Sequence, residues 1–294
     1  MKQNKGPLLF LTIFTIILFK NNQAIHDAIL SSCELFITRL FPSLFPMMVL
    51  SDLFIYFDLP GLLCKWIGSV FQRVFHTSPY GAFVFFISSF SGSPANAYTI
   101  KNLHEQGYLS VTEASHVLAF SFFSNPLFLY TMLSLIFPND LPTVLKLILL
   151  PYVINLILGF CLRKKNITLQ NMQPNPREDF GVFFSKSIKK AMNTLLFILG
   201  TVTIFFILNQ ILNPCHIPIF SGIFEISQGL NTLVNADISY KLKEILAIFF
   251  ISFGGLSIHL QIKGILSDTK ISYKTFFLYR IYQSILSVLF ICVI

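Results

Sequence analysis

Charged side chains are scarce in this chain. Only 12% of its 294 residues are Asp, Glu, Lys or Arg, whereas an ordinary soluble domain has about 25%. Hydrophobic residues account for 54%, and 34 residues are Phe. No stretch is polar enough to form a separate soluble domain, which excludes an additional enzymatic or nucleic-acid-binding module. We therefore predict an all-α polytopic membrane protein.

Cysteine and catalytic motifs are also sparse. The five Cys residues are scattered and mostly lie in apolar surroundings, so they indicate neither a disulfide framework nor a CxxC metal pair. The sequence contains no HExxH, GxSxG, Walker or GxGxxG motif. From these absences we predict that the protein is not an enzyme and has no cofactor and no metal site.

Acidic residues are outnumbered, so the chain carries a net charge of +8. Most cations lie in loops beside apolar runs, where the positive-inside rule places them, so the charge indicates topology rather than a nucleic-acid partner. The densest group lies in segment 163–190, which we assign to the cytoplasm. Its cations are Arg163, Lys164, Lys165, Arg177, Lys186, Lys189 and Lys190.

Long apolar runs predict about eight to ten membrane segments. The first run, Pro7–Phe19, follows Lys2 and Lys5 like a signal-peptide core, but no cleavage site follows it, so we expect a retained helix. The amphipathic segment Gly61–Phe75 is expected to lie in the membrane interface. Uninterrupted spans are expected at Leu40–Phe57, Leu141–Cys161, Ala191–Leu212 (after an amphipathic lead-in, Phe180–Lys190) and Thr275–Ile294.

Other apolar runs are cut by Gly, Ser or Pro before they are long enough to span. The run Phe85–Pro94 recurs with one serine fewer as Phe249–Ser257, and another interruption occurs at Ser124-Asn125-Pro126. Opened backbone at membrane depth is tolerated only where protein or a water-filled cavity satisfies it. We therefore predict broken or re-entrant helices in two pseudo-repeats: an N-terminal half over 1–162, a basic segment over 163–190 and a C-terminal half over 191–294.

A helix that begins within the membrane presents free N–H groups to an anion. The alternative is that Gly and Ser only allow the helices to pack closely. Polar residues follow each break, and inverted-repeat transporters bind substrate where such elements meet, which favours a binding site. The predicted substrate-binding residues are Ser91, Gly92, Ser93, Asn96, Asn125, Gly254, Gly255, Ser257, His259 and Gln261.

Ionisable residues inside a membrane are costly and are read as functional by default. Lys101 and Lys263 either attract an anionic substrate or extend to the interface. Of the acidic residues, Glu225 is the one that we most expect to be buried. Two roles are open for it: it carries a coupling proton or cation, or it caps a helix near the surface. We expect Asp52, close to the end of its segment, to be in contact with water.

Five motifs together resemble the YlbJ-type sporulation integral membrane proteins, within the wider group that carries the nucleoside-recognition, or gate, domain. Their order and spacing run from about Ser32 to Ser287. One departure is that Ser93 and Tyr98 stand where many relatives have an aromatic and a basic residue. The motifs lie at Phe41–Pro46, Ser91–Ala97, Gly107–Ala114, Phe123–Phe128 and Ser252–Gln261.

The resemblance implies a membrane protein of endospore-forming bacteria, acting at the outer forespore (mother-cell) membrane, with distant kinship to concentrative nucleoside transporters. It implies transport of a small organic anion, with dipicolinate as the candidate. A nucleoside permease and a non-transporting sporulation scaffold are the alternatives. Expected partners are the lipid bilayer, the anionic substrate, and either a second copy of the chain or other sporulation membrane proteins, but no nucleic acid.

Overall fold

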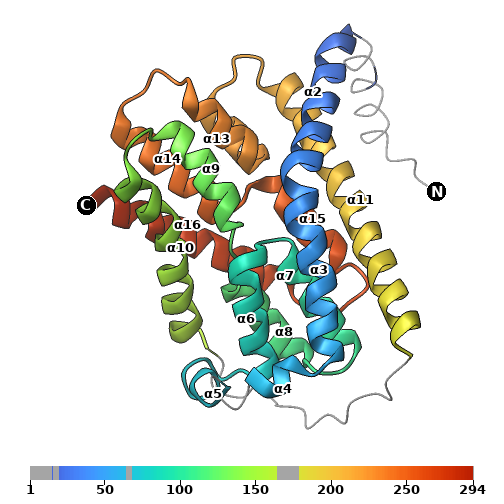
Figure 1. Cartoon of the computed structure of the whole chain (residues 1–294). Coiled ribbons are helices and arrows are strands. Elements are labelled where there is room, and N and C mark those ends of the chain that lie inside the picture. The colour runs from blue at the N-terminus through green and yellow to red at the C-terminus, as the bar shows by residue number, and fades with distance from the viewer. Residues whose placement is uncertain (1–14, 16–19, 64–67, 164–178, 294) are drawn as a thin grey trace, which may run out of the picture.

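A computed structural model describes residues 15, 20–63, 68–163 and 179–293 (Figure 1). Every regular element in these ranges is a helix, which confirms the all-α prediction. Most of the predicted helix over Pro7–Phe19 and most of the basic segment, 164–178, lie outside the described residues. The stretches long and apolar enough to cross a membrane are Asn22–Tyr56, Leu141–Cys161, Phe180–Leu212, Tyr240–Ile265 and Tyr273–Val293.

The first of these stretches is one continuous helix that consists of three consecutive segments. These are α2 (Asn22–Leu35), the π-helical turn η1 (Phe36–Leu40) and α3 (Phe41–Tyr56). The prediction of a separate span beginning at Leu40 is therefore wrong. A π turn widens the hydrogen-bonding pattern and often marks a functional site. Here it lies just before Pro42 and Pro46, and Arg39 is its fourth of five residues.

The two halves of the chain follow the same order of elements. Each begins with a long helix and ends with a 21-residue helix. Between them lie two pairs of shorter helices, and a break separates the two members of each pair. In the first half these are α2–α3, then α6 (Pro79–Ser91) with α7 (Ala95–Glu105), α8 (Val111–Phe120) with α9 (Pro126–Ile136), and α10 (Leu141–Cys161). In the second half they are α11 (Phe180–Leu212), α12 (Pro218–Phe224) with α13 (Ile226–Val234), α14 (Tyr240–Phe253) with α15 (Gly255–Ile265), and α16 (Tyr273–Val293).

The hairpins α6–α7 and α12–α13 lie at opposite ends of α11. Its 33 residues make a rod roughly 50 Å long. Lys190, in the N-terminal part of α11, forms an ion pair with Glu105 at the end of α7, with N and O 2.6 Å apart. The hairpin α12–α13 follows the other end of α11 directly, and Figure 1 shows α13 above α7. The prediction that the two halves are pseudo-repeats stays a prediction.

The short helices α4 (Leu59–Leu63) and α5 (Ser69–Phe75) lie between α3 and the first hairpin. They form the described part of the segment predicted to lie in the interface. Both are drawn at the lower end of the molecule in Figure 1, close to α6. Arg163, at the end of α10, donates to the backbone carbonyl of Val74 at 2.7 Å, which ties α5 to the end of the first half.

Side-chain caps fix where the helices begin. The predicted capping box at Ser110 is present in part, since Ser110 Oγ accepts from the backbone N–H of Glu113 at 3.2 Å. The Glu113 carboxylate does not return to Ser110 but accepts from the backbone N–H of Ser78, just before α6. This buried carboxylate therefore joins the start of α8 to the start of α6, and it satisfies a free donor there.

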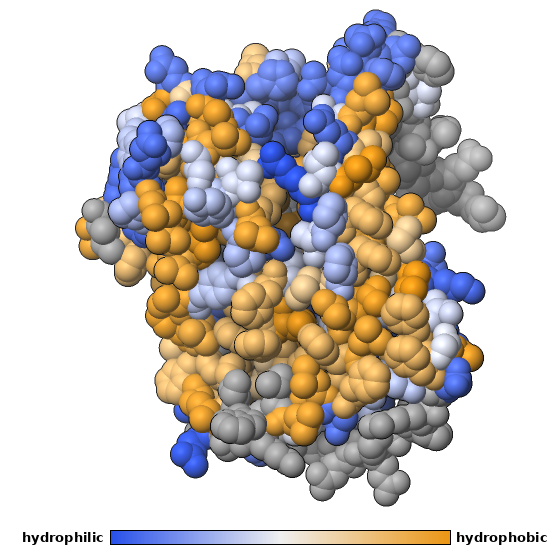
Figure 2. Space-filling view, viewed as in Figure 1, coloured by the Kyte–Doolittle hydropathy of each residue, from blue (hydrophilic) through white to orange (hydrophobic). Residues whose placement is uncertain are grey.

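Much of the surface is apolar. Figure 2 shows hydrophobic side chains over much of the lower half and the sides of this face, and hydrophilic ones along its upper edge and from there into the middle. Leu149, Leu196 and Leu289 are each more than half exposed on long helices. Many polar side chains are buried instead, among them Asp52, Asn96, Asn155 and Arg280. This surface is suited to contact with lipid, because exposing apolar side chains to hydrocarbon has no free-energy cost, whereas exposing them to water does.

Candidate functional site

The breaks of the first half pack directly against one another. The backbone N–H of Ser93 donates to the carbonyl of Phe123 at 2.6 Å, and Asn125 Nδ2 donates back to the carbonyl of Phe90 at 3.3 Å. A Cβ atom on Gly92 would stand 2.6 Å from the backbone N of Asn125. The absence of a side chain on Gly92 therefore allows the two opened segments to touch.

Four of the backbone carbonyls at the break between α8 and α9 accept hydrogen bonds from distant parts of the protein. Membrane interiors require such pairing because lipid offers no hydrogen bonds. The donors come from four elements that are distant in sequence. Arg280 donates to the carbonyl of Ala119 at 2.6 Å, Asn96 to that of Ser121 at 3.2 Å, Asn155 to that of Phe122, and the Ser93 backbone to that of Phe123.

The breaks of the second half form a corresponding pair. Gly254 and Gly255 both have positive φ, +90° and +73°, and a Cβ on Gly255 would stand 3.2 Å from the Cα of Glu225. Glu225 separates α12 from α13, and its carboxylate accepts from Ser227 Oγ and from the Gln228 backbone N–H, the latter at 2.9 Å. Glu225 is 4% exposed, so it is buried as expected and acts as a helix cap.

A pocket lies where the four breaks meet. Its cavity volume is about 50 Å³, and it is partly open to solvent. Residues of three breaks line it directly, α15 after the fourth break contributes residues one and two turns into the helix, and the two long helices complete the lining. The lining residues include Ser93 and Pro94, Ser124 and Asn125, Glu225 to Ser227, Ile258 and Gln261, and also Arg39, Ser43, Ile198 and Val202.

A second, more polar hollow adjoins this pocket; we refer to it as the vestibule. Ser31, Glu34, Thr38, Gln228 and Asn231 line it, and it shares Leu35, Arg39 and Ser227 with the pocket. It is formed between α2 and α13, toward the end of α11 that is farther from the basic segment. Figure 2 shows hydrophilic side chains reaching from the upper edge into the middle of this face. The vestibule therefore gives water a route to the pocket.

Arg39 lies at the boundary between pocket and vestibule. It stands midway along the 35-residue stretch Asn22–Tyr56, and it is half-buried. Its Nη1 lies 2.6 Å from the sulfur of Met132, a weak acceptor. Among the residues that the structure describes, no carboxylate lies within ion-pair distance of it. Sequence reasoning missed Arg39, although a lone cation between apolar runs was a signal for it.

Four of the residues predicted from the sequence line the pocket: Ser93, Asn125, Gln261 and Glu225. Gln261 donates from Nε2 to Ser257 Oγ at 3.0 Å, so the two share a helical face as predicted. The remaining predicted substrate-binding residues lie outside the lining of both hollows: Ser91, Gly92, Asn96, Gly254, Gly255, Ser257 and His259.

Two of these outlying residues support the breaks instead. Asn96 is fully buried, and its Oδ1 accepts from Ser93 Oγ at 3.0 Å while its Nδ2 reaches Ser121. His259 is bonded through one ring nitrogen to the carbonyl of Phe253 at 3.1 Å and through the other to Tyr273 Oη at 3.0 Å. In this conformation their polar atoms hold opened backbone in place, and substrate contact by them stays a prediction.

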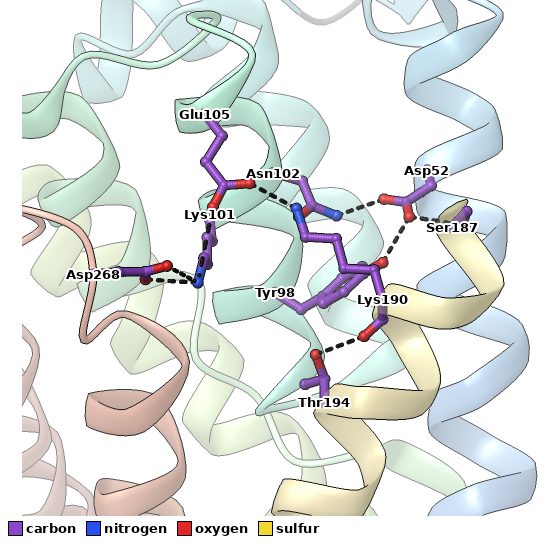
Figure 3. A network of polar contacts seen from close by, with 9 residues as sticks. All are labelled: Asp52, Tyr98, Lys101, Asn102, Glu105, Ser187, Lys190, Thr194 and Asp268. Atoms are coloured by element: carbon purple, nitrogen blue, oxygen red, sulfur yellow. Dashed lines mark hydrogen bonds and ion pairs between the residues drawn. The ribbon is translucent and has the colours of Figure 1, made fainter. Parts of the chain in front are cut away.

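Lys101 and Lys263 line neither hollow. Lys101 Nζ forms an ion pair with Asp268, in the loop between α15 and α16, with N and O 2.6 Å apart (Figure 3). The hydrogen bond from Lys101 lowers the pKa of the exposed Asp268 carboxyl. Lys263 is exposed on α15. The alternative in which these lysines extend toward the protein surface therefore fits this conformation better.

Asp52 is buried, which contradicts the expectation that it is in contact with water. It is 5% exposed and accepts three hydrogen bonds, from Tyr98 Oη at 2.6 Å, Asn102 Nδ2 at 2.6 Å and Ser187 Oγ at 2.7 Å (Figure 3). These donors replace the water that a buried carboxylate loses. The contacts connect α3 with the hairpin helix α7 and with α11.

The described residues contain no group of three His, Cys, Asp or Glu side chains placed to hold a metal ion. The arrangement consists instead of a pocket whose wall is largely apolar with a few polar side chains, one cation at its mouth and several helix starts around it. Such a set of groups can bind an anion reversibly.

Comparison with known proteins gives one informative match. The chain is 25% identical to the sporulation integral membrane protein YlbJ of Bacillus subtilis (strain 168), over 327 aligned positions that cover 96% of this chain and 80% of that protein. No family model and no solved structure matches the chain. The similarity spans nearly the whole sequence, and it confirms the resemblance to the YlbJ-type sporulation integral membrane proteins that the motifs indicate.

Proposed function

We propose that this protein transports a small organic anion during endospore formation, without a chemical step, and that dipicolinate is the substrate. The observation that carries the proposal is the meeting of four interrupted helices at one pocket between membrane spans. Secondary transporters bind their substrates at such a place. Similarity to the sporulation protein YlbJ supports the sporulation role. We assign the protein to the outer forespore membrane, carrying the anion from the mother cell.

The pocket suits an anion because helix starts face it. Ser93 and Pro94 precede α7 and Asn125 caps α9, and all three residues line the pocket. The start of α13 is not available in the same way, because the Glu225 carboxylate already caps it. The positive end of each helix dipole contributes about 0.3–2 kcal/mol to a bound negative charge. A dicarboxylate gains from two such ends, whereas a neutral nucleoside gains little.

The polar contacts on the side opposite the vestibule suit an inner gate. Asp52 joins α3, α7 and α11, and Lys101 joins α7 to the loop before α16. Transport requires that one side of the pocket closes while the other opens. We propose that the vestibule is the open side of this conformation and that release of the α7 contacts opens the other side.

A second candidate function rests on Glu225. This buried carboxylate lines the pocket, where a nucleoside permease with a coupling cation requires an acid. In an anion transporter the same residue would carry the coupling proton. The two functions therefore differ in the solute that moves and agree on the role of Glu225.

Flux into liposomes tests the proposal. The full chain is reconstituted and supplied with radiolabelled dipicolinate or uridine, alongside Gln261→Ala in the pocket lining and Gln23→Ala on an exposed helix face as the matched control. We expect dipicolinate flux in the wild type and in Gln23→Ala, and reduced flux in Gln261→Ala. Uridine flux alone would favour the permease. Correctly inserted protein that moves neither solute would favour the scaffold.

A further inference from the structure

Arg39 occupies an unusual position for a cation. It lies at the middle of a membrane helix, within the π turn η1, and contributes to both the pocket and the vestibule. Apart from its contact with the Met132 sulfur, the guanidinium group has no hydrogen-bond acceptor among the residues that the structure describes, so most of its donors are available to a ligand. An arginine at membrane depth is costly, so its retention points to a ligand or a path for one.

A second polar group at the pocket lacks a partner. Ser124 is 9% exposed and lines the pocket, and its Oγ makes no hydrogen bond. An unpaired buried hydroxyl costs about 1–3 kcal/mol. Ser124 belongs to the opened segment before α9, where Asn125 Oδ1 already accepts from the backbone N–H groups of Leu127 and Phe128, so the Ser124 hydroxyl is the donor that this segment leaves unpaired at the pocket. A bound oxygen anion would satisfy this hydroxyl.

The acids near Arg39 are accounted for. The Glu225 carboxylate is directed to Ser227 and Gln228 at the start of α13, where hydrogen bonds already hold it. Glu34 is exposed on the vestibule side. Neither is within ion-pair distance of Arg39. The Arg39 guanidinium, at the boundary between pocket and vestibule, therefore has no counterion among the residues that the structure describes.

We propose that Arg39 binds a carboxylate group of the substrate, with Ser124 Oγ as a further donor. This inference rests on the proposed function, because it assigns the residue that recognises the transported anion. The planar guanidinium offers two parallel N–H donors that match the two oxygens of a carboxylate, which a lysine ammonium cannot reproduce. The π turn places this fork where the vestibule meets the pocket, so that it receives an anion as it enters.

Equilibrium binding to the purified full chain in detergent tests this assignment. The probe is radiolabelled pyridine-2,6-dicarboxylate, and the competitor is the neutral pyridine-2,6-dicarboxamide. The variants are Arg39→Lys, Arg39→Met and Ser124→Ala. Arg73→Met, which alters an exposed arginine on α5, is the matched control. Thermal unfolding of each variant checks that it is folded.

We expect the wild type and Arg73→Met to bind the dicarboxylate, and the dicarboxamide not to displace it. Arg39→Met should weaken binding about tenfold or more, which is typical for the loss of a hydrogen bond to a charged group. Arg39→Lys and Ser124→Ala should each weaken binding several-fold, about threefold or more. The same loss in Arg39→Lys as in Arg39→Met would indicate that the fork geometry matters as much as the charge.

Unchanged binding in Arg39→Met and Arg39→Lys would overturn the assignment, and so would displacement by the neutral amide at the same concentration as by the unlabelled acid. If Arg39→Met does not fold, Arg39→Lys and the amide competition still decide. Failure of the proposed function looks different. It would appear as Arg39-dependent binding of the dicarboxylate without flux in liposomes.

Discussion

Gly92 lies against the backbone of Asn125, so that a Cβ atom on the glycine would stand 2.6 Å from the asparagine nitrogen. This contact brings together two interruptions that are 33 positions apart in the chain. It also fixes the start of α9, because Asn125 Oδ1 accepts from the backbone N–H groups of Leu127 and Phe128. One wall of the pocket therefore depends on the absence of a side chain at residue 92.

Gly92→Ala should destabilise the protein by about 1–3 kcal/mol, because the new methyl meets backbone and φ is +76°. Gly200→Ala is the matched control, since a Cβ there meets nothing within 4 Å and the residue lies within α11. That control should be neutral or stabilising by up to about 1 kcal/mol. Thermal unfolding in detergent measures both. Equal unfolding temperatures for the two variants would contradict the packing described.

Asp52→Ala should also lower the unfolding temperature. It leaves the donors of Tyr98, Asn102 and Ser187 buried without their acceptor, at about 1–3 kcal/mol for each unsatisfied group. Asp27→Ala, on an exposed face of α2, is the control and should have little effect. A double-mutant cycle with Tyr98→Phe should give a coupling energy, because the two side chains share a hydrogen bond. Strict additivity would mean that this bond contributes nothing.

The Lys101–Asp268 ion pair should affect transport more than stability. Because Asp268 is exposed and Lys101 only partly so, the pair contributes about 0–1 kcal/mol to folding. The hydrogen bond from Lys101 lowers the pKa of Asp268. The ion pair therefore contributes to stability when the pH is above the pKa of an ordinary aspartate, and this contribution is lost as the pH falls through the lowered pKa of Asp268. Lys101→Asp should change the flux in liposomes, and adding Asp268→Lys should restore part of it. A double variant no better than the single one would exclude a gating role.

Arg280→Met should be strongly destabilising, by about 3–5 kcal/mol. Arg280 is fully buried, donates to Ala119 and Asn155, and stacks over the Phe122 ring at 4.3 Å. Its loss leaves the carbonyl at the end of α8 unpaired at membrane depth. Arg280→Lys should recover part of the stability. Arg73→Met serves as the exposed control, and unfolding in detergent as the measurement.

Glu225→Gln should uncouple transport from the proton gradient while keeping the cap, since the amide oxygen can still accept from the Gln228 backbone. Dipicolinate flux is measured in liposomes with and without an imposed pH gradient. The control is Glu34→Gln, an exposed acid of the vestibule. We expect the gradient to stimulate the wild type and the control but not Glu225→Gln. Equal stimulation of all three proteins would remove Glu225 from the coupling step.

Several elements could be predicted from the sequence because their signals are local. The helix Leu141–Cys161 has the predicted bounds, and the terminal helix begins within two residues of the prediction, since a long apolar run is itself the signal. The interruptions at Gly92, Asn125 and Gly254 were located because Gly and Pro alter the backbone at their own positions. The lead-in predicted at Phe180–Lys190 and the span predicted at Ala191–Leu212 form one helix, α11. The span predicted to begin at Leu40 is the second part of a longer helix, Asn22–Tyr56, because the polar stretch before it is helical as well.

The sequence does not predict which breaks pack against one another, because these contacts form between segments that are distant in the chain. The sequence repeat relates Phe85–Pro94 to Phe249–Ser257, yet in the structure Gly92 contacts Asn125 and Gly255 contacts Glu225. The burial of Asp52 could not be foreseen either, because its donors come from residues 46 to 135 positions away. The sequence around a residue does not show which distant side chains will form hydrogen bonds with it after folding.

The sequence by itself determined that this protein is an all-helical membrane protein whose helices are interrupted at particular points, because apolar length and backbone stereochemistry act locally. Only the tertiary structure decided that the interruptions converge on one pocket, that Arg39 lies at its mouth, and that Asn96 and His259 support backbone. Those outcomes depend on which opened N–H and C=O groups meet across distant helices. In a medium without water, every such group needs a partner, and only the folded chain can supply it.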